Sequence, residues 1–142
     1  MKEFHTSVDI QASPLRVWAV LCDVERWPEW TASIRSVQRL DSGPFAMGSR
    51  ARVIQPKLRP AVWQVTELDE GRSFVWESRS PGLRIIAGHV VEPYAAGTRV
   101  TLSVEFSGLL GPLMGSLTRG LTEQYVPMEA QGLKMRSEQP AA

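Results

Sequence analysis

The stretch Gly111–Arg136, GPLMGSLTRGLTEQYVPMEAQGLKMR, decides the fold. Its apolar side chains recur every three or four residues, which is the period of a helix with one apolar face. Together with Leu110 just before the stretch, these are Leu113, Met114, Leu117, Leu121, Tyr125 and Met128. Pro112 suits a helix start because a proline in the first turn loses no helical hydrogen bond. A helix over this stretch would be about 39 Å long, and a chain of this size buries such a stripe by wrapping a sheet around it.

The segments upstream supply that sheet. They alternate apolar and polar side chains, as strands with one buried face do. We predict strands over residues 4–10, 34–40, 49–55, 61–68, 73–79, 83–91 and 98–106. The turns between consecutive strands from residue 34 onward are short, which implies antiparallel neighbours.

Two short helices are expected between the first and second strands. Ser13-Pro14 is an N-cap followed by proline at the first helical position. A second short turn ends at Trp27, because the residue before a proline is pushed out of helical geometry. The prediction is therefore an α+β fold. A seven-stranded antiparallel curved sheet wraps around a long C-terminal helix in a single domain, residues 1–142, with residues 137–142 as a disordered tail.

Composition narrows the function classes. The net charge is +1 and no run of Lys or Arg is present, which argues against a nucleic-acid surface. Cys22 is the only cysteine, so no internal disulfide can form. No apolar run approaches the roughly 20 residues of a membrane helix, and the N-terminus has no apolar signal core. We expect a cytoplasmic protein without stable membrane insertion, either a monomer or a homodimer.

The combined pattern resembles the START-like, helix-grip superfamily, and within it the small SRPBCC proteins of polyketide cyclase/dehydrase type. The segments that carry the resemblance are Ala12–Trp18, Asp23–Trp30, Trp63–Glu67, Phe74–Glu77, Gly97–Thr101 and the terminal helix. The superfamily includes lipid and hormone carriers and aromatic polyketide cyclases. The resemblance implies an apolar cavity between the sheet and the long helix that is open to a hydrophobic ligand. It does not identify a reaction, because fold alone does not determine function.

Two polar residues are expected to face that cavity. His89 shares its strand face with Ile85 and Val91, and Tyr125 lies on the apolar stripe of the helix. A neutral imidazole there could act as an acid or base or orient a ligand hydroxyl. The alternative is a histidine satisfied by a backbone carbonyl or a water. His89 has no carboxylate in register, so its pKa should fall below about 6.5.

The remaining cavity-lining residues are predicted from the inward strand and helix faces. With His89 and Tyr125, the predicted ligand-binding set is Trp63, Phe74, Trp76, Val91, Leu102, Val104, Leu117 and Leu121. The aromatic members could equally be plain core. The inward set contains no Asp, Glu, Lys or Arg, which favours a neutral or weakly polar ligand.

The first functional hypothesis is therefore binding of a small hydrophobic molecule that is lipid-like, polyketide-like or aromatic. The alternative is a cofactor-independent cyclase or dehydratase in which His89 is the general acid/base and Tyr125 polarises a carbonyl. With two histidines far apart and one cysteine, no metal site is expected. A third option, an interaction module that uses the exposed sheet face, lacks a recognisable apolar patch.

Overall fold

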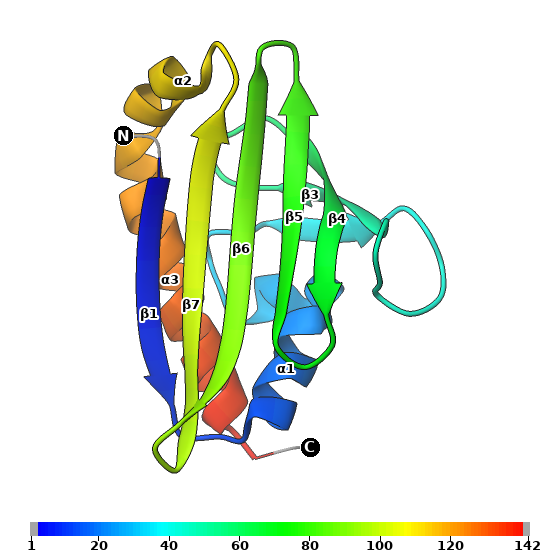
Figure 1. Cartoon of the computed structure of the whole chain (residues 1–142), viewed down its shortest axis with the longest axis vertical. Coiled ribbons are helices and arrows are strands. Elements are labelled where there is room, and N and C mark those ends of the chain that lie inside the picture. The colour runs from blue at the N-terminus through cyan, green and yellow to red at the C-terminus, as the bar shows by residue number, and fades with distance from the viewer. Residues whose placement is uncertain (1–2, 141–142) are drawn as a thin grey trace.

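A computed structural model describes residues 3–140 and contains one antiparallel sheet with helices on one side of it (Figure 1). The elements in chain order are β1 (Glu3–Ile10), α1 (Pro14–Cys22), the 3-10 helix η1 (Val24–Glu29), β2 (Ser36–Arg39), β3 (Arg50–Ile54), β4 (Ala61–Asp69), β5 (Ser73–Ser80), β6 (Leu83–Tyr94), β7 (Gly97–Ser107), α2 (Gly111–Leu117) and α3 (Arg119–Glu138).

The seven strands follow the order β1-β7-β6-β5-β4-β3-β2, and every neighbouring pair is antiparallel. β1 therefore pairs with the distant β7, with Val8 opposite Val100. The ladder between β4 and β5 shifts register between Val65 and Glu67. Such a bulge bends a strand and increases its twist. The predicted helix-grip fold is confirmed.

The predicted start of α1 is also confirmed. The Ser13 side chain accepts a hydrogen bond from the Arg16 backbone N–H at 3.2 Å, and Pro14 is the first helical residue. The helix buries Val17, Trp18 and Leu21. The Trp18 ring meets Phe74 of β5 edge-on, with ring centroids 6.3 Å apart. This packing closes one end of the core with α1.

The prediction of one continuous terminal helix is wrong. The chain breaks at Thr118 into two helices, α2 and α3. The predicted apolar stripe is wrong over α2, where Leu113 and Leu117 are 55% and 69% exposed. α2 packs against the sheet through its glycines instead. Gly111 and Gly115 are its buried residues, and a side chain at Gly111 would meet the Phe106 carbonyl. The leucines therefore point away from the sheet.

Beyond the break, α3 buries a different face, formed by Thr122, Tyr125, Val126, Ala130, Gly132, Leu133 and Ser137. The helix reaches Glu138, so the expectation of a disordered tail is wrong for residues 137–138. The Glu138 carboxylate accepts a hydrogen bond from the Gln11 backbone N–H at 2.8 Å, which explains the order at this end. The last two residues of the expected tail, 141–142, lie outside the described residues.

Within residues 3–140, none of the helices combines the length and the apolar character that crossing a bilayer requires.

Candidate functional site

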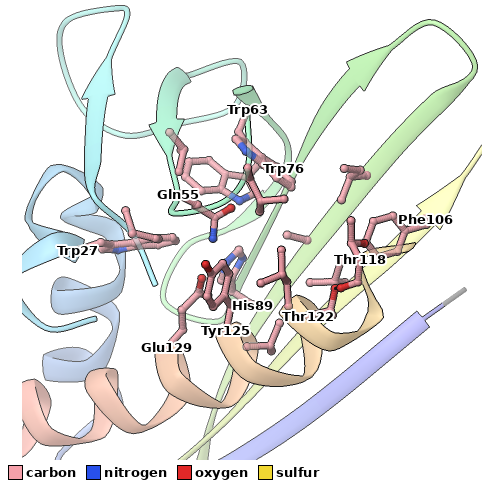
Figure 2. A pocket seen from close by; sticks show the side chains of 18 residues that line it. Trp27, Gln55, Trp63, Trp76, His89, Phe106, Thr118, Thr122, Tyr125 and Glu129 are labelled. Atoms are coloured by element: carbon pink, nitrogen blue, oxygen red, sulfur yellow. The ribbon is translucent and has the colours of Figure 1, made fainter. Parts of the chain in front are cut away.

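A cavity of about 140 Å³ lies between the inner face of the sheet and α3 (Figure 2). Strands β3 to β7 and helix α3 supply most of its wall, and η1 adds Trp27. Its lining residues are Trp27, Ile34, Val53, Gln55, Leu58, Trp63, Trp76, Ile85, Ala87, His89, Val104, Phe106, Thr118, Leu121, Thr122, Tyr125, Val126 and Glu129. The wall is thus largely apolar and aromatic with a few polar groups, which is the usual character of a small-molecule site.

Three indole rings form one aromatic cluster in this wall. Trp76 is central, with ring centroids 5.3 Å from Trp27 and 5.8 Å from Trp63. Trp76 is 3% exposed, whereas Trp63 is only partly buried. These edge-to-face and tilted contacts fix the rings relative to one another, so the aromatic wall is held in place without a ligand.

His89 on β6 belongs to the cavity wall and is 4% exposed. Its ring stacks on Phe74, with centroids 4.0 Å apart and an interplanar angle of 11°. Nδ1 lies 3.1 Å from the Phe74 carbonyl oxygen, and a carbonyl can only accept, so Nδ1 carries the proton. Burial lowers the pKa of His89 to about 4, opposed in part by this hydrogen bond. The ring is therefore neutral near pH 7 and Nε2 is left as an acceptor.

Tyr125 on α3 also lines the cavity, and its hydroxyl donates to the Pro56 carbonyl oxygen at 2.6 Å. Because that proton is already shared with the backbone, Tyr125 presents a lone pair to the cavity. The cyclase hypothesis requires Tyr125 to donate a hydrogen bond to a ligand carbonyl. In this geometry Tyr125 cannot do so.

The expectation that no charged residue faces inward is wrong, because Glu129 lies in the cavity wall. Figure 2 shows its side chain pointing into the cavity with those of Tyr125 and His89. Burial raises the pKa of Glu129 to about 8, while a hydrogen bond from Ser33 acts in the opposite direction. A signal for it was present in the sequence. Glu129 follows Tyr125 by four residues, a spacing that places two side chains on the same helix face.

The structure brings six of the predicted ligand-binding residues to the cavity: Trp63, Trp76, His89, Val104, Leu121 and Tyr125. Phe74, Val91 and Leu102 are buried outside its lining, and Phe74 instead forms the surface on which His89 stacks. Leu117 does not reach the cavity, because α2 turns it toward solvent.

Besides Glu129, three polar lining residues were not predicted. Gln55 follows β3 and donates to the Ser33 carbonyl oxygen at 3.3 Å. Thr118 donates its hydroxyl proton to the Met114 carbonyl oxygen at 2.7 Å, and Thr122 donates to the Thr118 carbonyl oxygen at 3.1 Å. The position of the two threonines follows from the helix break at Thr118, which has no signature in the apolar periodicity.

A second hollow, of about 660 Å³, lies beside the turn between β6 and β7. Its charged groups already have partners in the protein: Asp9 binds Arg99 at 2.7 Å, and Lys134 donates to the Asp9 carbonyl oxygen at 3.0 Å. Among residues 3–140, no cluster of three or more His, Cys, Asp or Glu side chains could hold a metal ion.

Comparison with known proteins gives a consistent result. The model of a family described as polyketide cyclase / dehydrase and lipid transport matches residues 1–138. A search of curated proteins returned no match.

Three solved structures illustrate the likeness of fold. A START superfamily protein from Mycobacterium smegmatis has a TM-score of 0.79 at 15% identity, covering 97% of this chain and 98% of its own. The Zhui aromatase/cyclase from Streptomyces sp. R1128 has a TM-score of 0.77 at 16% identity, covering 96% and 93%. A protein from Thermus thermophilus has a TM-score of 0.75 at 22% identity, covering 95% and 96%. At these identities the likeness extends to the fold alone.

Proposed function

Because the chain belongs to the polyketide cyclase/dehydrase and lipid transport family, we propose that it binds a small hydrophobic molecule in the cavity between the sheet and α3. The observation that supports this most directly is the cavity itself. Three tryptophans and a set of aliphatic side chains line it, and polar groups are few.

The size of the cavity limits the ligand. Apolar cavities of about 150 Å³ in proteins admit a molecule of the size of benzene, and this one has about 140 Å³. The ligand proposed is therefore built on one aromatic ring or a comparable aliphatic body. A larger polyketide or lipid would need the cavity to widen.

A cofactor-independent cyclase or dehydratase remains the second candidate. The observation in its favour is His89, whose Nε2 lacks a proton and lies on a ring in the cavity wall. Two observations weigh against it. The partner of Nδ1 is a backbone carbonyl rather than a carboxylate that would stabilise an imidazolium, and the hydroxyl proton of Tyr125 is shared with Pro56.

Binding can be tested with toluene and two leucine substitutions on β6. Ala87→Leu adds bulk inside the cavity, whereas Val90→Leu adds it on the outer face, where Val90 is 44% exposed. We expect amide NMR signals of cavity residues to shift saturably when toluene is added to the native protein. Ala87→Leu should weaken binding about tenfold or more, since two groups cannot occupy one volume, and Val90→Leu should leave it unchanged. Absence of saturable shifts, or equal binding by all three proteins, would contradict the proposal.

A further inference from the structure

Four polar side chains of the cavity wall already donate their proton to the backbone. The hydroxyl protons of Thr118, Thr122 and Tyr125 are each donated to a backbone carbonyl. The N–H of His89 is donated to Phe74 in the same way. What these side chains offer a ligand is therefore lone pairs, on three hydroxyl oxygens and one imidazole nitrogen. A ligand that donates hydrogen bonds suits this wall.

Glu129 adds a carboxyl group to the same wall and has no cationic partner there. The lining residues include no Lys or Arg. The titratable groups that share the lining with Glu129 are His89 on β6, which is neutral near pH 7, and Tyr125 on α3, whose hydroxyl donates to the Pro56 carbonyl oxygen. The loop before β2 contributes the neutral hydroxyl of Ser33, itself hydrogen-bonded to Thr31 at 2.6 Å. A carboxylate that is removed from water is stabilised by a paired positive charge, and the residues that line the cavity supply none.

Aromatic faces complete the arrangement. Trp27, Trp63 and Trp76 line the cavity that Glu129 enters, and in Figure 2 the Trp63 and Trp76 side chains lie across the cavity from Glu129. Tryptophan is the aromatic side chain that attracts organic cations most strongly, and the attraction increases when the cation leaves water.

From this geometry we infer that the ligand is an organic amine, whose ammonium group pairs with Glu129 while its apolar body lies against the tryptophans. The inference rests on the proposed function, which it narrows to a chemical class. Binding is coupled to proton release, because the Glu129 carboxyl proton passes to solvent when the ammonium group arrives. One N⁺–H···O⁻ hydrogen bond then replaces the O–H bond, and the acceptors on His89 and Tyr125 are available for the remaining N–H groups.

Benzylamine and benzyl alcohol provide a matched pair of probes, since they have the same size and differ in the terminal group. We would measure both by isothermal titration calorimetry at pH 6.5 and pH 8.5. In the native protein we expect benzylamine binding to strengthen about tenfold between the two pH values as the Glu129 carboxyl ionises. Benzyl alcohol binding should change less than about twofold, because it carries no charge to pair with the carboxylate.

Two glutamine substitutions on α3 distinguish a direct contact between Glu129 and the amine from a general effect of removing a negative charge. At pH 8.5, Glu129→Gln should weaken benzylamine binding by about 10- to 100-fold, the effect of one charged hydrogen bond, and should remove its pH dependence. Glu123→Gln is the control, because Glu123 lies on the same helix and pairs with Arg119 at the surface at 3.4 Å. That variant should behave like the native protein.

A measurement on the native protein avoids any change in folding. Carboxyl carbon NMR should show the pKa of Glu129 falling when benzylamine saturates the cavity. An unchanged pKa, benzylamine binding no tighter than benzyl alcohol at pH 8.5, or full affinity in Glu129→Gln would each overturn the inference. If toluene binds under these conditions while benzylamine shows no preference, the inference fails and the proposed function stands. If neither toluene nor benzylamine binds, both fail.

Discussion

Glu129 and His89 lie in one cavity wall, and burial shifts their pKa values in opposite directions. The pKa of His89 falls to about 4 and that of Glu129 rises to about 8. Both groups are therefore neutral over the pH range between those values. A protein interior favours this outcome because it stabilises the uncharged form of each group.

Stability should depend on pH in a way that identifies each group. Between pH 4.5 and 8, folded Glu129 holds a proton that the unfolded chain releases, so its contribution to the free energy of unfolding falls as pH rises. Between pH 4 and 6.5, the unfolded chain protonates His89 and the folded protein does not, so that contribution rises with pH. Below pH 6.5 the two contributions to the pH dependence of the free energy of unfolding largely cancel. From about pH 6.5 to 8, of these two groups only Glu129 contributes.

The first prediction concerns Glu129→Gln. Relative to the native protein, this variant should gain stability on the order of 1 to 2 kcal/mol as pH rises from 6.5 to 8, because it has no carboxyl to ionise. Urea unfolding at a series of pH values measures the difference. A difference that is constant across that range would mean that Glu129 is exposed to water and titrates normally.

The second prediction concerns His89→Phe, which has different expected effects if the protein is a carrier and if it is an enzyme. In a carrier, the change should weaken a ligand that donates a hydrogen bond to Nε2 by about 0.5–1.5 kcal/mol and leave toluene binding intact. In an enzyme that uses His89 as its base, turnover of a poly-β-carbonyl substrate should fall by a factor on the order of 100 to 10,000 with binding retained. Ligand titration and a product assay on the same preparation distinguish the two.

The third prediction concerns the indole rings. Trp76 is 3% exposed and packs against five other rings, so Trp76→Ala should lower the free energy of unfolding by about 3–5 kcal/mol. Trp63→Ala should cost clearly less, because Trp63 is only partly buried and borders the cavity. Trp63→Ala should instead change toluene affinity. Equal losses of stability would place both rings in close-packed core.

At the scale of elements, strand alternation predicted the sheet correctly and helix periodicity predicted the terminal helix only in part. A strand has two faces, so an alternating pattern leaves one choice for the buried side. A helix has many possible faces, and the leucines of α2 mimic an inward stripe although glycines make the contact with the sheet. For the same reason the helix pattern did not reveal Glu129, although it lies one turn beyond Tyr125, which lines the cavity.

The fourth prediction tests this assignment of helix faces. Leu117→Ser should change the free energy of unfolding by no more than about 0.5 kcal/mol, because the side chain is 69% exposed. Leu133→Ala on α3 should cost about 2–5 kcal/mol, because Leu133 is fully buried. Thermal or urea unfolding of both variants measures the contrast, and a large loss in Leu117→Ser would restore the predicted continuous stripe.

The fifth prediction concerns two glycines of α3. A Cβ at Gly132 would collide with the Trp30 backbone carbonyl, whereas a Cβ at Gly120 would meet nothing within 4 Å. Gly132→Ala should therefore destabilise the protein by about 1–3 kcal/mol or more through forced movement of the helix. Gly120→Ala should be neutral or stabilising by up to about 1 kcal/mol, since alanine is the better helix former. A stable Gly132→Ala variant would mean that α3 does not dock closely against Trp30.

At the scale of the whole molecule, α3 is attached to the first third of the chain by polar contacts near its C-terminal end. Lys134 donates to the Asp9 carbonyl oxygen at 3.0 Å, Arg136 pairs with Glu29 at 2.6 Å, and Glu138 accepts from Gln11 at 2.8 Å. None of these contacts could be predicted from the sequence, because each joins residues more than one hundred positions apart and depends on how the sheet places β1. The sequence determined which segments form elements, whereas the site depends on where those elements meet.

The pairing of β1 with β7 affects when the chain can fold during its synthesis. Phe4 lies opposite Val104, so the first strand leaves the ribosome about one hundred residues before its partner exists. At roughly 5–20 residues per second, it waits on the order of 5 to 20 seconds. The residues of α3 that bury the inner sheet face emerge later still. Until then that face is open to other proteins in the cell, and chaperones that recognise unpaired apolar strands are expected to act on this chain chiefly in that interval.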